Sequence, residues 1–220
     1  MPRLTWHEAG TKVYETGLDR GALYLRNDQG EYTEGEAWNG LISVTESPSG
    51  AEPTKEYADN NVYLTLMSVE EFGATIECYT YPDSFARCNG EAEPIDGVFV
   101  GQQDRETFGF TYRTLVGNDI DSNNHGYKIH LVYGALASTS DKAYNTVNDS
   151  PEAVNFSYEV TTTPVEVEGM KPSALLTIDS TKVPAAGLTA LEAALYGSEG
   201  GEDPRLPLPN EVLELLDTAA

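Results

Sequence analysis

Regular alternation of apolar and polar side chains is the feature that most restricts the fold of this chain. In 107–113, the aromatic residues Phe108, Phe110 and Tyr112 occupy every second position. Successive side chains of a β-strand point to opposite faces, so this period of two predicts a half-buried strand. The same pattern occurs in 62–67, 127–133 and 156–161, and weaker examples are 22–25, 41–45, 74–81, 98–101, 165–168 and 174–179.

Turn residues separate these segments, and helical patterns are scarce. Asn89-Gly90 and Asp96-Gly97 supply residues that tolerate positive φ, as tight turns require. One helix is expected at 189–196, with a capping box that begins at Thr189 and a stop at Gly197, and a second, shorter one at 83–88. The sequence therefore predicts a mainly β fold, a sandwich or barrel with one or two short flanking α-helices.

Three regions are expected along the 220 residues. A β domain occupies 1–180, and it contains a hairpin tip at 117–126 and a long loop at 46–61 that has two prolines and no core periodicity. A short helical segment follows at 181–197, and a flexible acidic linker with an apolar C-terminal tail at 198–220. A loop as long as 46–61 within a compact domain is usually functional or mobile.

The charge balance narrows the choice of partners. The chain has 36 acidic and 13 basic residues, a formal net charge of −23. Binding to a phosphate backbone depends on Lys and Arg displacing counterions, so this composition argues against a nucleic-acid-binding protein. No apolar run reaches the length of a membrane helix and no signal peptide is visible, so a soluble protein made in a reducing cytoplasm is expected.

The chemistry-bearing residues give no positive case for an enzyme or for a cofactor. Asp119–Asn123 begins like a calcium loop, but Asn124 and His130 stand where Gly and Glu are needed, so a solvated hairpin tip is favoured. Neighbouring Glu70 and Glu71 are expected by chance in so acidic a chain.

The two cysteines, Cys78 and Cys88, lack zinc-ligand spacing and have no visible base partner. Small buried thiols are favoured over a disulfide, because two cysteines are too few for a disulfide scaffold.

Several blocks carry a resemblance to a known family. The blocks are 37–41, 44–53, 66–77 (LMSVEEFGATIE), 79–83, 126–134 (GYKIHLVYG) and 156–164. Over roughly 35–165 the chain resembles the major tail protein, or tail tube subunit, of long-tailed bacteriophages.

The resemblance implies a structural protein of the virion tail, assembled in the cytoplasm of a bacterial host. Proteins of this family form six-membered rings that stack into the tube through which viral DNA leaves the capsid. Their β-sandwich or barrel joins its inner sheet to those of neighbours in one lumen wall. The implied partners are further copies of the chain, the tape-measure protein, the tail terminator and the distal tail proteins, while DNA passes without specific binding.

Two properties of the residues fit this role independently. Exposed strand edges in a β-rich subunit would be paired by neighbours in a closed ring. Acidic side chains on a lumen wall would repel the phosphates of passing DNA within a Debye length of about 8–10 Å.

Candidate assembly residues follow from the same hypothesis. Loop 46–61 is expected to contact the next ring through Pro53 or Tyr57. The tail is expected to dock on a neighbouring subunit through its leucines, Leu206, Leu208, Leu213 and Leu216. Glu159 and Thr161, on the polar face of 156–161, are the candidates for the lumen wall, with an outer solvated face as the alternative.

Three alternative functions stay open. A capsid decoration or head–tail joining protein would form a single ring or a shell coating but no stacked tube. A β-sandwich carbohydrate-binding module would use exposed Tyr and Trp side chains, and an acidic glycosidase is the last candidate. The 13 tyrosines do not separate these functions, because strands favour Tyr in any case.

Overall fold

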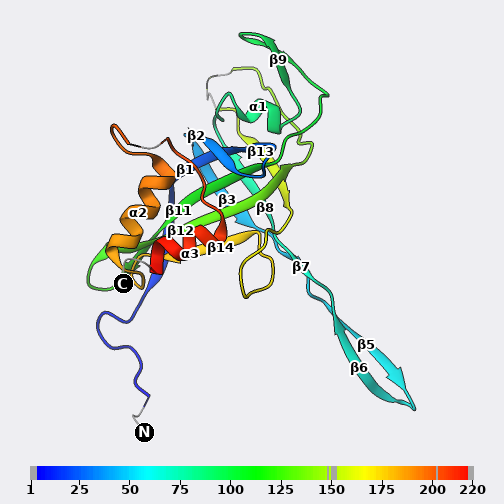
Figure 1. Ribbon diagram of the computed structural model, residues 1–220, viewed down its shortest axis with the longest axis vertical. Helices are drawn as coiled ribbons and strands as arrows, with labels where there is room; N and C mark the ends of the chain where they lie inside the picture. Colours follow the sequence, from blue (N-terminus) through cyan, green and yellow to red (C-terminus); the bar gives the residue numbers. More distant parts are fainter. Residues whose placement is uncertain (1–3, 148, 150–152, 202, 218–220) are drawn as a thin grey trace.

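A computed structural model describes residues 4–147, 149, 153–201 and 203–217. The prediction of a mainly β fold is confirmed, because one large antiparallel sheet forms the body of the molecule (Figure 1). Its strands run in the order β2-β1-β11-β12-β13-β8-β3, and β14 pairs with the free side of β12. The strand bounds are β1 (Tyr14–Arg26), β2 (Tyr32–Trp38), β3 (Leu41–Glu46), β8 (Gly73–Cys78), β11 (Phe108–Asn118), β12 (Ser122–Ala137), β13 (Phe156–Thr162) and β14 (Leu175–Asp179).

Most predicted strands lie in this sheet. Segments 107–113, 127–133 and 156–161 fall within β11, β12 and β13. The prediction at 165–168 is wrong: Val165 forms only an isolated bridge to Ser173. Segment 62–67 is a strand, but it lies outside the main sheet and is exposed along its whole length, so the expectation that it is half-buried is also wrong.

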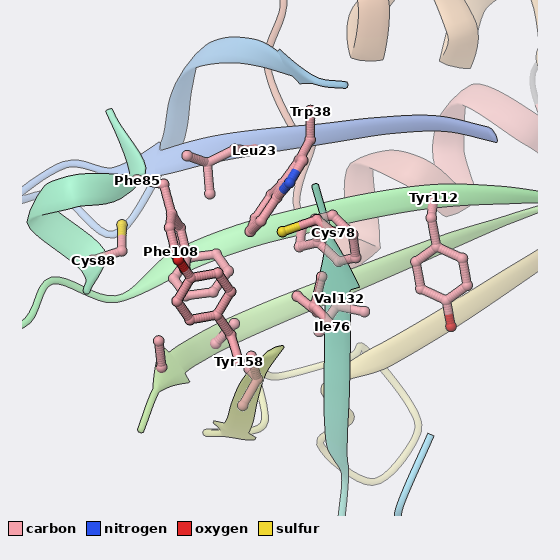
Figure 2. Close-up of a cluster of buried hydrophobic side chains, with 14 of the residues drawn as sticks. Leu23, Trp38, Ile76, Cys78, Phe85, Cys88, Phe108, Tyr112, Val132 and Tyr158 are labelled. Atoms are coloured by element: carbon pink, nitrogen blue, oxygen red, sulfur yellow. The ribbon is translucent and has the colours of Figure 1, made fainter. Parts of the chain in front are cut away.

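A first hydrophobic core fills the concave side of the sheet. The sheet curls so that β8 crosses over β11 and β12, which brings Ile76 and Cys78 against Phe108 and Val132 (Figure 2). The short helix α1 (Phe85–Cys88) inserts Phe85 into the same cluster. Its ring lies 4.7 Å from that of Trp38 and 4.9 Å from that of Tyr158, between centroids.

A second core covers the opposite face of β1 and β12. Helices α2 (Ala185–Tyr196) and α3 (Pro209–Asp217) pack there, and Leu191 and Val212 are completely buried against Ile129, Leu131 and Tyr133. The central strands are therefore buried on both faces, unlike the half-buried strands that alternation predicted. The described helices include none long and apolar enough to cross a membrane.

The start of α2 differs from the prediction, while its end agrees with it. The helix ends before Gly197, which has a positive φ of 73°. It begins one turn earlier than expected, after Pro184, whose extended backbone occupies the N-cap position. Thr189 is therefore inside the helix, where its hydroxyl donates to the carbonyl oxygen of Ala185 instead of capping.

Strand β12 changes partner at Gly134. Its middle residues, Lys128 to Val132, pair with β14, and its last residues, Ala135 to Ala137, pair with β13. Gly134 has φ +58°, and a Cβ there would overlap the carbonyl oxygen of Thr163. Glycine is thus required at the point where the long strand bends and lets the sheet curl around the first core.

Candidate assembly surfaces

A two-stranded arm projects from the body of the molecule. It consists of β5 (Pro53–Ala58) paired with β6 (Asn61–Met67), on a root formed by β4 (Ser49–Gly50) and β7 (Glu70–Glu71). Figure 1 shows it extending away from the sheet, between β3 and β8. The expectation of a loop at 46–61 is therefore wrong: these residues form one side of a hairpin, and 62–67 forms the other.

The arm exposes an unusual amount of apolar surface. Every residue of β5 and β6 is exposed, including Pro53, and Tyr57 is 69% exposed. The large apolar side chains of the arm are exposed by 38% to 79%, and they are Tyr57, Val62, Tyr63, Leu64, Leu66, Met67 and Val69. Exposed apolar side chains gathered on one projecting element are typical of an interaction site.

A short-range signal identifies this hairpin in the sequence. Asp59 and Asn60 form the tip with φ of 51° and 63°, between the paired residues Ala58 and Asn61. Two consecutive residues with positive φ are the mark of a type I′ hairpin turn, for which Asp and Asn are suited. The prolines of 46–61 and the charged residues of β5 concealed the alternation.

A second exposed hairpin lies at the opposite end of the molecule (Figure 1). Strands β9 (Ala92–Ile95) and β10 (Val98–Val100) pair around the predicted turn Asp96-Gly97, where Gly97 has φ +81°. All their residues are exposed, and the large apolar ones are exposed by 46% to 69%: Ile95, Val98, Phe99 and Val100. The sequence pattern predicted a strand at 98–101 but not its exposure.

The convex side of β13, β8 and β3 is a polar sheet face. Glu159 and Thr161 are exposed on it, whereas Tyr158 and Val160 point into the first core. Glu159 pairs with Thr75, which pairs with Thr45, so a row of polar side chains crosses the three strands. The three strands contain three glutamates and no Lys or Arg.

The C-terminal tail packs on its own subunit. Leu206 is 2% exposed in the second core, and its backbone NH donates to the carbonyl oxygen of Tyr32 on the outer edge of β2. Leu216 also packs against this core. The expectation that these two leucines dock on a neighbour is thus wrong, because the convex side of β1 and β12 offers them a surface within the chain. Leu208 and Leu213 are each 40% exposed and stay available. Residues 202 and 218–220 of the predicted tail lie outside the described residues.

A polar cluster lies beside the first core, where β11, β12 and β14 meet. His130 is 7% exposed, and its Nδ1 and Nε2 atoms each lie 3.7 Å from a carboxylate oxygen, of Glu46 and Glu15 respectively. Burial lowers the pKa of His130 more than the two carboxylates raise it. Although burial opposes it, hydrogen bonds from Lys128 and Thr114 hold the pKa of Glu15 below its usual value. His130 is therefore neutral at pH 7.

The predicted hairpin tip between β11 and β12 is stabilised by a side chain. Asn118 accepts hydrogen bonds at Oδ1 from the backbone NH groups of Ile120 and Asp121, and it pairs with Ser122 across the turn. Nowhere in the described part of the chain do three or more His, Cys, Asp or Glu residues gather in an arrangement that could hold a metal ion.

Both cysteines are free and buried, as predicted. Figure 2 shows Cys78 on β8 and Cys88 at the end of α1, both within the first core. Burial raises the pKa of Cys78 to about 11 and that of Cys88 to about 12. Neither thiol is ionised at neutral pH, so both behave as small apolar side chains.

No family model matches the sequence. A search of curated proteins likewise finds no match.

Proposed function

We propose that this chain is a structural subunit that assembles with further copies of itself into stacked rings, as the tail tube of a long-tailed bacteriophage. The observation that carries the proposal is the arm. An isolated two-stranded hairpin is at best marginally stable in water, and this one exposes seven large apolar side chains. A subunit of this shape is completed by burying the arm against another molecule.

The polar sheet face supports a lumen role in the same proposal. Duplex DNA carries one negative charge per about 1.7 Å of its axis, so a wall that lets it pass must lack basic anchors. Strands β3, β8 and β13 meet this condition, since they have no Lys or Arg and expose Glu159 and Thr161. The net charge of −23 fits a wall that repels nucleic acid.

The free edges of the sheet also fit assembly in a ring. The edge of β2 is covered by the chain itself, because Gly35 donates to Pro204 and Leu206 donates to Tyr32. Strands β3 and β14 end the paired order on their sides of the sheet. Pairing of the β3 edge of one copy with the β14 edge of the next would give a heterologous contact. Repeated contacts of this kind close into a ring when the rotation between neighbouring copies is a whole fraction of a full turn.

Negative-stain electron microscopy of the concentrated, purified protein tests the proposal. Hollow rings or tubes are the expected result. Single rings that never stack would favour a capsid decoration or head–tail joining protein. Persistent monomers with a melting temperature that rises on addition of sugars would replace the proposal with the carbohydrate-binding module.

A further inference from the structure

The polar cluster around His130 contains a buried titratable group that the proposed function does not use. The side chain of His130 is 9% exposed and lies between two carboxylates, one 3.7 Å from Nε2 and the other 3.7 Å from Nδ1. Its charged and titratable neighbours are Glu15 on β1, Glu46 on β3, Tyr112 on β11 and Lys128 on β12 itself. Strand β14 contributes Thr177, which does not titrate.

The hydrogen bonds around the imidazole ring determine which nitrogen carries the hydrogen. Thr114 has one hydroxyl hydrogen, which it donates to Glu15. Thr114 can therefore only accept from Nε2 of His130, 3.0 Å away, so the neutral ring has its hydrogen on Nε2. Nδ1 is left as the acceptor for the hydroxyl of Thr177, 3.4 Å away. A second proton would thus enter at Nδ1, on the side of Glu46.

The closed cluster accommodates a second proton poorly. Burial lowers the pKa of His130 more than Glu46 and Glu15 raise it. The hydroxyl of Tyr112 already donates to Glu46, 2.6 Å away, and burial raises the pKa of this phenol, so it stays protonated. An imidazolium at this place loses more in hydration than it gains from the carboxylates. Any local opening that admits water to the ring therefore binds the proton more tightly than the closed cluster does.

The end of β3 is the side of the cluster that opens most easily. Glu15 is fixed by two donors, Lys128 and Thr114. Glu46 is the last residue of β3, its side chain is 40% exposed, and β3 ends the paired order of the sheet. Strands β11 and β12, by contrast, have paired strands on both sides. Local opening begins at terminal, exposed elements of this kind.

The end of β3 also holds one side of the arm. Only Ser47 and Pro48 separate Glu46 from β4 in the root of the arm. The backbone NH of Ser47 donates to the carbonyl oxygen of Gly73, 2.8 Å away, at the start of β8. The other side of the arm returns to β8 through Phe72, whose carbonyl oxygen accepts from the hydroxyl of Thr162.

We propose that His130 is a proton-operated latch for the arm: entry of a second proton at Nδ1 releases the end of β3 and, with it, one of the two connections between the arm and the sheet. The connection through Phe72 stays in place, so the arm remains attached but its direction is less restricted. The latch acts within one copy and does not depend on what the arm binds.

Hydrogen exchange of dilute, monomeric protein between pH 7.5 and 5 tests the latch. Backbone NH groups of 45–50 report on the end of β3, and those of 108–116 in β11 report on global unfolding. After correction for the intrinsic effect of pH on exchange, the protection of 45–50 should fall about tenfold for each pH unit between 6.5 and the folded-state pKa of His130. Low concentrations of urea should accelerate exchange in β11 but not in 45–50, because a local opening exposes little surface.

Two variants separate His130 from the carboxylates near the arm. His130→Gln keeps a hydrogen-bonding side chain that takes up no proton, so the protection of 45–50 should not change with pH. Glu70→Gln is the matched control, because it removes a charge from the root itself, on exposed β7, and leaves His130 in place. The fall in protection should persist in this control. Circular dichroism verifies that both variants fold.

The latch is rejected if the protection of 45–50 in the wild type does not depend on pH, or if it falls equally in His130→Gln. It is also rejected if urea accelerates exchange in 45–50 as much as in β11, since the loss of protection would then report global unfolding. An NMR titration of the His130 ring in the wild type gives the folded-state pKa without any variant. A value at or above about 6.5 would remove the driving force and overturn the proposal.

Discussion

The imidazole ring of His130 lies flat against the phenol ring of Tyr112, with centroids 4.5 Å apart and planes that differ by 4°. The hydroxyl of Tyr112 donates to Glu46, 2.6 Å away, and Glu46 is the last residue of β3, from which the arm departs. On the other side of His130, Thr114 Oγ1 lies 3.0 Å from Nε2 and donates to Glu15. The stacked pair therefore links the end of β3, where the arm begins, to β1 through the buried His130.

Stability should fall in mild acid because of His130. Its pKa in the folded state is lowered, so the unfolded chain binds a proton first as the pH falls below about 6.5. The contribution of neutral His130 to the free energy of unfolding is complete above pH 6.5. It is lost as the pH falls towards the folded-state pKa, by about 1.4 kcal/mol for each unit that separates the unfolded-state pKa from the folded-state pKa. Urea unfolding between pH 7.5 and 5 measures the loss.

One variant isolates this histidine. His130→Gln removes the titrating group and should flatten the pH dependence. Glu15, Asp19 and Asp179 also have lowered pKa values, but these carboxylates act below about pH 4.5. A wild-type slope in His130→Gln would contradict the assignment.

Phe85→Ala should destabilise the fold strongly. The ring is completely buried, and it makes edge contacts with Phe108, Tyr158 and Tyr81 at 4.9 to 5.8 Å between centroids. Removing a buried Phe side chain costs about 3–5 kcal/mol, because a cavity is left behind. Phe99→Ala is the matched control: this ring is 46% exposed, and the free energy of unfolding should change by less than about 0.5 kcal/mol.

Gly134→Ala should be costly although it adds a single methyl group. The residue has φ +58°, and its Cβ would overlap the carbonyl of Thr163, so strain of about 1–3 kcal/mol is expected. Gly101→Ala, where a Cβ meets no atom within 4 Å, should leave thermal unfolding almost unchanged. Equal melting temperatures for the two variants would show that β12 does not need its bend.

The leucines of the tail should divide into two classes. Leu206→Ala should cost about 2–5 kcal/mol of unfolding free energy, because the side chain is 2% exposed in the second core. Leu208→Ala should leave the fold nearly unchanged, because that side chain is 40% exposed. Chemical denaturation distinguishes the two. A small effect of Leu206→Ala on the monomer would restore the original hypothesis of docking on a neighbour.

A basic side chain on the polar sheet face should make the assembled protein retain DNA. Glu159→Lys places a cation on the proposed lumen wall, whereas Glu199→Lys makes the same charge change in an exposed turn after α2. Co-sedimentation of a short duplex with assembled protein should rise for Glu159→Lys alone and disappear as salt is added. Equal retention by both variants would place β13 on an outer surface.

Alternation predicted the strands well but not what covers them. Gly109 and Thr111 read as a solvent-facing side of β11, yet both are buried. A Cβ at Gly109 would overlap Leu206 and the ring of Tyr32, so the glycine makes room for a side chain that arrives nearly 100 residues later. A sequence pattern records the period of a strand and carries no information on which distant segment packs over it.

The candidate surfaces were predictable to different degrees. Alternation placed Glu159 and Thr161 on the polar face of β13, and both side chains are exposed there. Tyr57, the expected contact to the next ring, is exposed, but the hairpin around it was missed, since the tip signal Asp59-Asn60 is short. Whether an apolar tail docks on its own chain or on a neighbour depends on an available surface, which only the packing of β1 and β12 provides.

The strap at 204–206, which closes the outer edge of β2, is made of residues that the ribosome adds long after β2 itself. Until they emerge, Tyr32 and Tyr133 have no cover from Leu206 and Pro207, and the edge of β2 stays open to any strand nearby. Premature termination before residue 204 should thus yield a chain that precipitates during translation. The edge of β2 is therefore protected only after synthesis has passed the strap.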